Sequence, residues 1–354
     1  MVERLPPGAA VGILGGGQLG RMLALAAARM GMRCHVFEPA AEPCAAPVVE
    51  RLTRAGYDDA DALIAFARSV DVVTYEFENV PLSAVDTVAG VVPVRPGRRA
   101  LEAAQDRVAE KDFLTGLGLA TAPYAAVNAA ADLAPALARF GPRGILKTRR
   151  MGYDGKGQVR IATPEGAAAA LAALGSPAVL EGVVDFECEI SVIAARGLDG
   201  AVIAFDPGGN VHRDGILHTT TVPARIAARV RDDAVLIAAR ILDALDYVGV
   251  IGVELFVTAG GLVVNEIAPR VHNSGHWTMD ACLTDQFETH MRAICGWPLG
   301  DGRRHSDAVM TNLIGAEAAA APEITGAAVH LYGKAEARPG RKMGHVTRLA
   351  PRNR

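Results

Sequence analysis

The apolar run Ala10–Leu14 ends in three consecutive glycines and leads directly into Gln18–Met30, where apolar residues recur at helical spacing. Two more apolar runs follow, Cys34–Phe37 and Val70–Tyr75, with the amphipathic segment Asp59–Ser69 between them. Consecutive parallel strands need a crossover connection, which is usually a helix. This alternation therefore predicts a doubly wound parallel sheet in the N-terminal third of the chain.

The glycine turn Gly15–Gly20 has the G-x-G-x-x-G spacing between a strand and a helix, where backbone amides favour an anion. Glu38 ends the following strand, at the place of the ribose-binding carboxylate in dinucleotide folds. The turn is thus compatible with a nicotinamide-dependent oxidoreductase, with another phosphate site, or with a tight turn that binds nothing.

Composition excludes several classes of protein. With 36 basic and 39 acidic residues the formal net charge is −3, so the chain lacks the basic surplus of a general nucleic-acid binder. The longest uncharged run, Leu114–Ala131, is barely long enough to span a bilayer and contains glycines and a proline. Five widely spaced cysteines without a C-x-x-C pair argue against a disulfide framework. We therefore expect a cytoplasmic protein that binds neither nucleic acid nor membrane.

A second glycine-rich loop follows the predicted strand Gly144–Lys147. It contains three glycines between residues 152 and 157, and Lys156 lies among them. Flexible backbone amides and lysine side chains can close over phosphates, although the G-x-x-x-x-G-K-[ST] pattern is absent. A plain hairpin turn explains the glycines, but it does not explain Lys147 at the end of the strand. Lysine is rare here, with five among the 36 basic residues, so we favour a phosphate site.

Two carboxylates, Glu254 and Glu266, lie on opposite strands of a predicted hairpin. A three-residue loop would pair Thr258 with Leu262 and set the carboxylates directly opposite each other, whereas a two-residue loop would shift the register by one. Like charges in opposed positions destabilise a sheet, and a divalent cation between them reverses that effect. The hairpin therefore predicts a magnesium site, the alternative being two solvated carboxylates on an exposed face.

Polar residues crowd the stretch Asn265–Trp277, directly after the second of these strands. Each of them could simply cap a turn, and a lone histidine is more often structural than catalytic. Arg270, His272 and His276 together, beside a candidate metal site, nevertheless indicate a reaction centre.

Five phrases occur in order along the chain: GGGQLGRM, TYEFENVP, GYDGKGQ, NEIAPRVHNSGHWT and RPGRKMGH. Together they resemble the ATP-grasp superfamily and, within it, the family of 5-(carboxyamino)imidazole ribonucleotide synthetases, from about Val11 to about Thr347. The last two phrases separate this family from other ATP-grasp ligases. The resemblance implies an α/β and α+β chain with the ATP-grasp fold. Its parts would be an N-terminal doubly wound, Rossmann-like substrate-binding domain (1–110), an ATP-grasp lid (111–185), a central domain with the metal site (186–300) and a small β-rich C-terminal lobe (301–354).

The resemblance also implies site residues. Magnesium would be held by Glu254 and Glu266. The nucleotide would be bound by Arg107, Lys147, Gly152, Tyr153, Asp154, Gly155, Lys156, Gly157, Gln158, the hinge residues Glu181, Gly182, Val183 and Val184, and by Glu189, His212, Asn265 and Glu266. The ribonucleotide would be surrounded by Gly17, Gln18, Leu19, Glu76, Tyr153, Asp154, Arg270, His272, Asn273, Ser274, Lys342 and Arg348. Arg270, His272 and Lys342 would be catalytic, with His272 handling a proton because its ordinary pKa lies near working pH.

The implied reaction is ATP-dependent carboxylation of aminoimidazole ribonucleotide by bicarbonate through carboxyphosphate, in purine biosynthesis, with ATP and Mg²⁺ as cofactors. A homodimer and a functional link to the mutase that uses the product are also implied. The alternatives are another ATP-grasp carboxylase or ligase, the nicotinamide oxidoreductase, and a binding protein without catalysis. The chain ends seven residues after Thr347, without the helix-forming segment usual in the family, so we expect a shortened C-terminal lobe.

Overall fold

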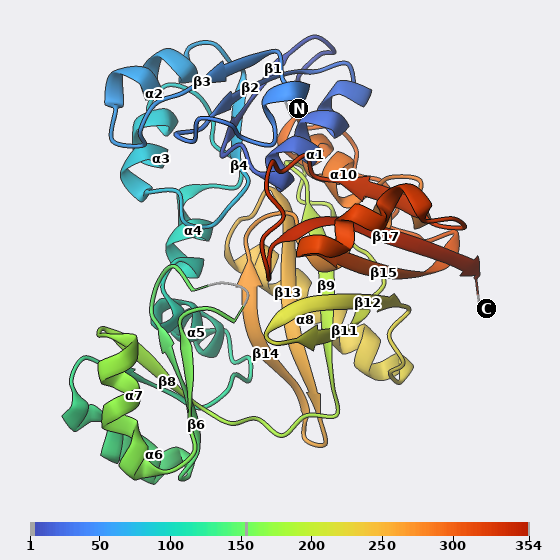
Figure 1. Cartoon of the computed structure of the whole chain (residues 1–354). Helices are drawn as coiled ribbons and strands as arrows, with labels where there is room; N and C mark the ends of the chain where they lie inside the picture. The colour runs from blue at the N-terminus through green and yellow to red at the C-terminus, as the bar shows by residue number, and fades with distance from the viewer. Residues whose placement is uncertain (1–3, 153–154, 353–354) are drawn as a thin grey trace.

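The computed structural model describes residues 4–152 and 155–352, and these form three sheets with their helices (Figure 1). The first sheet is parallel, in the order β3-β2-β1-β4. Its strands and helices are β1 (Ala10–Leu14), α1 (Gln18–Arg29), β2 (Arg33–Phe37), β3 (Arg51–Thr53), α2 (Ala60–Ala67), β4 (Val72–Tyr75) and α3 (Leu82–Ala89).

Alternate side chains of this sheet face its two covering layers. Val11 and Ile13 belong to the core that includes α1, whereas Ala10 and Leu14 belong to the core that includes α2 and α3. Apolar residues on both faces are expected for a parallel sheet that is covered on both sides. The doubly wound parallel sheet predicted from the sequence is confirmed.

Helices α4 (Arg98–Ala104) and α5 (Arg107–Gly116) connect this domain to a second sheet, which is antiparallel in the order β5-β8-β6-β7. Leu137 of α6 and Leu171 of α7 are buried in the core of this unit. The glycine-rich loop joins β6 to β7 at its edge. The remaining bounds are β5 (Tyr124–Val127), α6 (Leu133–Phe140), β6 (Gly144–Thr148), β7 (Gln158–Ile161), α7 (Ala167–Leu174) and β8 (Ala178–Gly182).

The third sheet is antiparallel and contains nine strands among the described residues, in the order β14-β13-β9-β11-β12-β15-β17-β16, with β10 paired to β9. Its strands are β9 (Cys188–Arg196), β10 (Val202–Ala204), β11 (Gly208–Arg213), β12 (Ile216–Val222), β13 (Gly249–Thr258), β14 (Gly261–Ala268), β15 (Ser306–Ile314), β16 (Ala328–Leu331) and β17 (Lys342–Pro351). The helices beside it are α8 (Ala228–Ala244), α9 (Thr278–Ala281) and α10 (Gln286–Ile294).

Two strands of the predicted small C-terminal lobe are long. β15 and β17 have nine and ten residues. They are long because β15 pairs with β12 from Thr219 to Val222 and with β17 along its length, so the central sheet continues into the C-terminal lobe.

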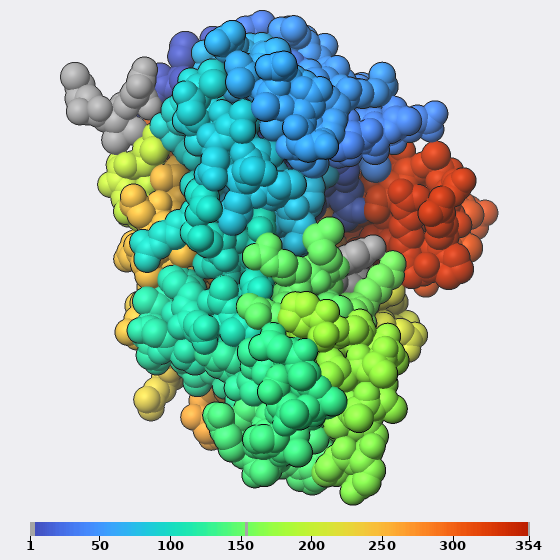
Figure 2. Space-filling view, turned by 90° about the vertical axis from the view of Figure 1, so that its left-hand side faces the viewer, coloured from blue at the N-terminus to red at the C-terminus, as the bar shows by residue number. Residues whose placement is uncertain are grey.

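Two helices cover opposite faces of this sheet. Val192 and Val253 pack with α8, whereas Ile193 and Val250 pack with α10. Because side chains alternate along a strand, Glu254 lies on the α10 face. The N-terminal domain, the lid and the C-terminal segment meet on one face of the molecule (Figure 2). In residues 4–152 and 155–352, no helix combines the length and the apolar character needed to cross a membrane.

Candidate active site

The two carboxylates of the predicted metal pair lie directly opposite each other on β13 and β14. The predicted loop length was wrong, because the loop has two residues and Thr258 pairs with Gly261. A β-bulge at Asn265 then restores the register, so that Glu254 pairs with Glu266. β-Bulges commonly change the direction in which a side chain points next to an active site. Here the bulge compensates for the shorter loop.

Charges around this pair are unevenly distributed. Burial and the neighbouring charge of Glu266 raise the pKa of Glu254 to about 7. Burial also opposes ionisation of Glu266, but Arg107 and Lys147 lower its pKa to about 2. Nη1 of Arg107 lies 2.9 Å from Oε2 of Glu266, and Nε2 of His272 lies 3.4 Å from Oε1 of Glu254. One carboxylate is thus held charged while the other is pushed towards protonation.

The pair fits a hard divalent cation. A cation between the two carboxylates would favour ionisation of both and remove their repulsion. No three His, Cys, Asp or Glu side chains within 4–152 and 155–352 are grouped so that they could hold a metal ion. A two-carboxylate site suits magnesium, which usually keeps several waters and binds through one or two carboxylates and substrate phosphates.

A buried ion cluster joins the lid to this hairpin. Nζ of Lys147, on β6, lies 2.8 Å from Oε2 of Glu181, and Nζ of Lys111, on α5, lies 3.2 Å from Oε1. Burial opposes ionisation of Glu181, but the two lysines hold its pKa below the ordinary value. Lys111 also donates to the carbonyl of Asn265 at 3.4 Å. Sequence reasoning missed the role of Lys111, although the scarcity of lysine could have drawn attention to it.

The glycine-rich loop of the lid reaches the central domain. Gly157 has a φ of 70°, and a Cβ there would lie 2.6 Å from Oγ1 of Thr148. Gly155 has a φ of 73°, and a Cβ there would lie 3.1 Å from Cα of Gly215, in the turn between β11 and β12. Both positions therefore require glycine. Lys156 lies between them, next to this contact.

Other predicted nucleotide ligands flank the same loop. Nη2 of Arg107, the first residue of α5, donates to the carbonyl of Gly152 at 3.4 Å. Gln158 begins β7. The predicted ligands Tyr153 and Asp154 lie outside the described residues.

The predicted ribose ligand Glu189, on β9, lies beside His212, on β11. Nδ1 of His212 is 2.6 Å from Oε2 of Glu189. Burial disfavours the charged imidazole, but the hydrogen bond and the charge of Glu189 raise the pKa of His212. The predicted hinge runs from the end of β8 to β9, through Gly182, Val183 and Val184.

Two carboxylates of the chain itself bind the amides of the N-terminal glycine turn. Glu76, directly after β4, accepts hydrogen bonds from the amides of Gly17 and Gly20, the second at 2.6 Å. Glu38 accepts from the amide of Gly16 at 2.7 Å. A Cβ on Gly17 would lie 2.5 Å from Oε1 of Glu76, so the glycine allows this close approach. The amides that a dinucleotide pyrophosphate would need already have partners, and the oxidoreductase alternative is not supported.

Arg270 follows β14 and is anchored by a carboxylate of the N-terminal domain. Its Nε donates to Oε2 of Glu78, and its Nη1 donates to the carbonyl of Val271 at 3.2 Å. Burial opposes ionisation of Glu78, but Arg270 holds its pKa below the ordinary value. Glu78 was not assigned from the sequence, and its only signal was its place in the phrase TYEFENVP.

His272 is held close to the metal pair. Its Nδ1 lies 2.8 Å from Oγ of Ser274, and its Nε2 faces Glu254. Burial, together with the cations Arg270 and Lys342, lowers the pKa of His272 to about 3. The imidazole is therefore neutral near pH 7, which corrects the expectation that it titrates there.

Three further predicted substrate ligands lie in different surroundings. Leu19, in the first turn of α1, is 9% exposed and packs in the core. Asn273 exchanges two amide hydrogen bonds with Asn312, at 2.9 and 2.7 Å. Arg348 is exposed on β17, six residues beyond Lys342, a separation of roughly 20 Å along a strand. The structure therefore brings Lys342, but not Arg348, towards the other site residues. A sequence motif predicts which residues lie near the site, but it does not predict where each side chain points.

The C-terminal lobe brings cations towards the glycine turn. Nζ of Lys334 donates to the carbonyl of Lys342 at 2.6 Å and lies 5.6 Å from the ring centre of Tyr332. Burial lowers the pKa of Lys334 to about 8. A Cβ on Gly333 would lie 3.7 Å from Nη1 of Arg21, on α1. Lys334 is a further lysine whose place in the site was missed.

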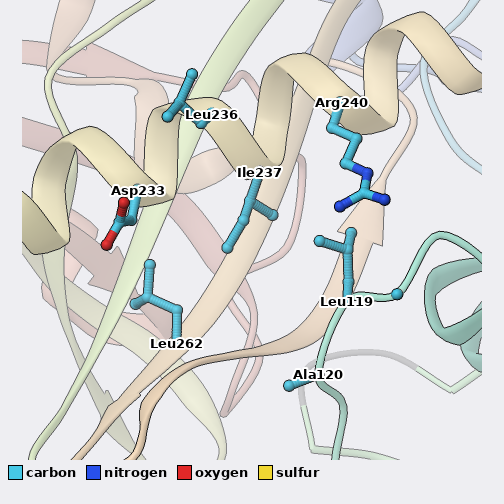
Figure 3. A pocket seen from close by; sticks show the side chains of 8 residues that line it. Leu119, Ala120, Asp233, Leu236, Ile237, Arg240 and Leu262 are labelled. Carbon is cyan, nitrogen blue, oxygen red and sulfur yellow. The ribbon is translucent and has the colours of Figure 1, made fainter.

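The pocket shown in Figure 3 is separate from this site. It has a volume of about 380 Å³ and lies between α8 and β14. Apolar side chains dominate its lining, and none of the predicted catalytic or metal-binding residues lines it. Its residues are Gly118, Leu119, Ala120, Asp233, Leu236, Ile237, Arg240 and Leu262.

Comparisons with known proteins agree with this arrangement. Models of the ribonucleotide synthetase preATP-grasp domain, the ATP-grasp domain and the phosphoribosylaminoimidazole carboxylase C-terminal domain match residues 9–105, 112–287 and 308–354. The N5-carboxyaminoimidazole ribonucleotide synthase of Brucella melitensis is 55% identical, over 98% of each chain. The chain belongs to the N5-carboxyaminoimidazole ribonucleotide synthase family. The predicted family and ATP-grasp fold are confirmed.

Crystal structures of N5-carboxyaminoimidazole ribonucleotide synthases have the same architecture. An ADP complex shares 40% identity and has a TM-score of 0.95, covering 99% of this chain and 94% of that chain. The synthase of Aspergillus clavatus, in complex with ADP and 5-aminoimidazole ribonucleotide, shares 32% identity and has a TM-score of 0.91, covering 98% and 94%. These relatives give no support to another ATP-grasp ligase or to an oxidoreductase.

Proposed function

We propose that this chain carboxylates the 5-amino group of 5-aminoimidazole ribonucleotide with bicarbonate and ATP, releasing ADP and phosphate. One observation carries the proposal. The carboxylate pair Glu254 and Glu266 is flanked by Arg107 and Lys147 from the lid side and by Arg270 on the side of the N-terminal domain. The relative from Aspergillus clavatus, which has the same architecture, is known in complex with ADP and the same ribonucleotide. The site thus combines a phosphoryl-transfer half with a carboxylate-binding half.

The first step of the proposed reaction forms carboxyphosphate. A bicarbonate oxygen attacks the γ-phosphorus, and the bond to the ADP oxygen breaks. Arg107 and Lys147 neutralise the charge that spreads over the phosphoryl oxygens. Magnesium held by Glu254 and Glu266 would stabilise the same charge electrostatically.

The second step transfers the carboxyl group. The 5-amino nitrogen bonds to the carboxyl carbon, either of carboxyphosphate or of carbon dioxide released from it, while the carbon–oxygen bond to phosphate breaks and the nitrogen loses a proton. The planar guanidinium of Arg270 suits a bidentate grip on a carboxylate, and Glu78 fixes its orientation. The departing phosphate accepts the proton, because the lowered pKa of His272, about 3, makes its imidazole a weak base. The neutral imidazole can still orient the reacting groups through hydrogen bonds.

Water must be excluded while carboxyphosphate exists, because this intermediate is short-lived in water. The glycine-rich loop suits this task, since it joins two strands of the lid and its Gly155 contacts the turn at Gly215. Lid closure of this kind sequesters a reaction from solvent. A requirement for Mg²⁺, a homodimer, a cytoplasmic location and a link to the mutase that uses the product are further predictions from the family resemblance.

Phosphate release from ATP tests the proposal when each component is omitted in turn. We expect release to need Mg²⁺ and bicarbonate and to be strongly stimulated by 5-aminoimidazole ribonucleotide. ATP hydrolysis that ignores the ribonucleotide would refute the proposed substrate. ATP binding without any release would instead indicate a binding protein without catalysis.

Replacing Lys342 by Ala should weaken ribonucleotide binding selectively. A hydrogen bond to a charged group contributes about 1.5–3 kcal/mol, so we expect the KM for the ribonucleotide to rise by roughly 10- to 100-fold. The KM for ATP should stay within threefold of wild type. Arg352→Ala, which removes an exposed charge beyond the end of β17, is the matched control. An unaltered ribonucleotide KM in Lys342→Ala would exclude this role.

Gly252→Ala should displace His272. A Cβ on Gly252, on β13, would lie 2.7 Å from Cβ and 3.0 Å from Cγ of His272, and side chains do not approach so closely without moving. A displacement of about 1 Å can lower a rate by roughly 10²-fold, so we expect a loss of that order in kcat. Gly116→Ala is the control, because nothing lies within 4 Å of that Cβ position. A wild-type kcat in Gly252→Ala would show that the placement of His272 is unimportant.

A further inference from the structure

The first residue of α10, Gln286, is fully buried behind the loop that carries His272. Oε1 of Gln286 accepts a hydrogen bond from the backbone amide of His272 at 2.9 Å. Nε2 of Gln286 donates to the backbone carbonyl of His272 at 2.8 Å. One side-chain amide therefore binds both backbone groups of the same residue, which fixes the peptide planes on either side of the imidazole.

Further contacts tie the same loop to the start of α10. Nε2 of Gln286 lies 2.9 Å from Nδ1 of His276. The backbone amide of Gln286 donates to Oγ1 of Thr278 at 3.0 Å, and this hydroxyl donates to the carbonyl of Gly275 at 2.7 Å. A Cβ on Gly275 would lie 2.7 Å from Oε1 of Gln286. The loop thus encloses the Gln286 side chain too tightly for either to move alone.

The N-terminus of α10 is itself anchored. Asp285 caps the helix by accepting hydrogen bonds from the amides of Phe287 and Glu288, at 2.8 and 2.9 Å. The same carboxylate forms an ion pair with Arg29 of α1, in the N-terminal domain. The first turn of α10, which carries Gln286, is therefore held in place by contacts within the central domain and by an ion pair with the N-terminal domain.

We infer that Gln286 is a positioning residue for the carboxylation, which holds His272 beside Glu254 without touching a reacting group. This inference rests on the proposed function of the site. If His272 moves, ATP and bicarbonate can still form carboxyphosphate, because Arg107 and Lys147 lie on other elements. The carboxyl transfer then fails more often, and carboxyphosphate decomposes to phosphate and bicarbonate or carbon dioxide.

Gln286→Met tests this role, because it keeps the length of the side chain and removes the amide. We expect the kcat for product formation to fall by roughly 10²-fold while the KM for ATP stays within threefold. We also expect more phosphate than carboxylated product, whereas the wild-type enzyme releases them in equal amounts. A variant that is merely less folded would release phosphate and form product more slowly by the same factor, so the two amounts would stay equal.

A matched control is available on the same helix. Thr289 is as deeply buried as Gln286, and its Oγ1 has no hydrogen-bond partner among the described residues, so Thr289→Val should leave the rates and their ratio unchanged. Gln286→Glu is a second test variant, since it keeps the acceptor but places an oxygen against the carbonyl of His272. We expect the same excess of phosphate from it.

Equal amounts of phosphate and product in both Gln286 variants would overturn the inference, whether their rates are normal or reduced. Failure of the proposed function would look different, because the wild-type enzyme itself would then show no phosphate release stimulated by the ribonucleotide.

Discussion

Replacing Glu266 by Gln is expected to lower the kcat of ribonucleotide-dependent phosphate release by roughly 10³-fold. A bound cation supplies several kcal/mol of stabilisation to a transferring phosphoryl group, and each 1.36 kcal/mol corresponds to a tenfold change in rate. Gln keeps the size of the side chain and removes its charge. The same substitution at Glu254 should cause a comparable loss, because the two carboxylates are expected to hold one cation between them.

The two variants together separate the metal site from the other contacts of Glu266. Glu266 pairs with Arg107, whereas Glu254 faces His272. A loss confined to Glu266→Gln would assign its effect to the Arg107 pair. Glu102→Gln, at an exposed residue of α4, is the control. Activity within a few-fold of wild type in both carboxylate variants would contradict the metal site.

Replacing Arg270 by Met is expected to reduce both activity and stability. Removal of one partner from a fully buried ion pair costs about 3–5 kcal/mol. The side chains of Arg270 and Glu78 are 17% and 20% exposed, so we expect a loss at or below the lower end of this range when Glu78 is left without its counter-charge. Loss of a charged group that stabilises reacting oxygens lowers kcat by roughly 10²- to 10³-fold. Melting temperature and steady-state kinetics measure the two effects separately.

A double variant distinguishes the two effects of Arg270→Met. Glu78→Gln combined with Arg270→Met removes the unpaired charge, so the melting temperature should recover towards that of the wild type. The kcat should stay low, because the guanidinium that grips the carboxylate is still missing. If the double variant regained wild-type activity, Arg270 would serve only to balance Glu78.

The local pattern of apolar residues was sufficient to predict the strands and helices of the N-terminal domain. The segment predicted as a helix over Gln18–Met30 is α1 (Gln18–Arg29), and the predicted strand Cys34–Phe37 is β2 (Arg33–Phe37). Apolar periodicity reports which face of an element is buried, so elements that pack on near neighbours can be predicted from it.

Long-range pairing was less accessible to sequence reasoning. The pairing of β12 with β15 joins residues about ninety positions apart, and it extends the central sheet into the segment that was predicted as a separate small lobe. The opposition of Glu254 and Glu266 was predicted correctly from the wrong loop length, because the bulge at Asn265 has no signature in the local pattern.

The partners of the site residues were the hardest part to predict. Motifs identified Lys147, Arg270 and His272, but the groups that anchor them come from other elements. Lys111 and Glu181 are 70 positions apart, and Glu78 and Arg270 are 192 apart. Such pairs follow from the packing of domains, which a single sequence does not display.

Bicarbonate labelled with ¹⁸O tests the proposed chemistry most directly. In that reaction a bicarbonate oxygen attacks the γ-phosphorus and stays with phosphorus when the carbon–oxygen bond breaks. With ATP, Mg²⁺ and 5-aminoimidazole ribonucleotide present, each released phosphate should therefore carry one ¹⁸O atom. Phosphate whose new oxygen comes from water would contradict the carboxyphosphate route.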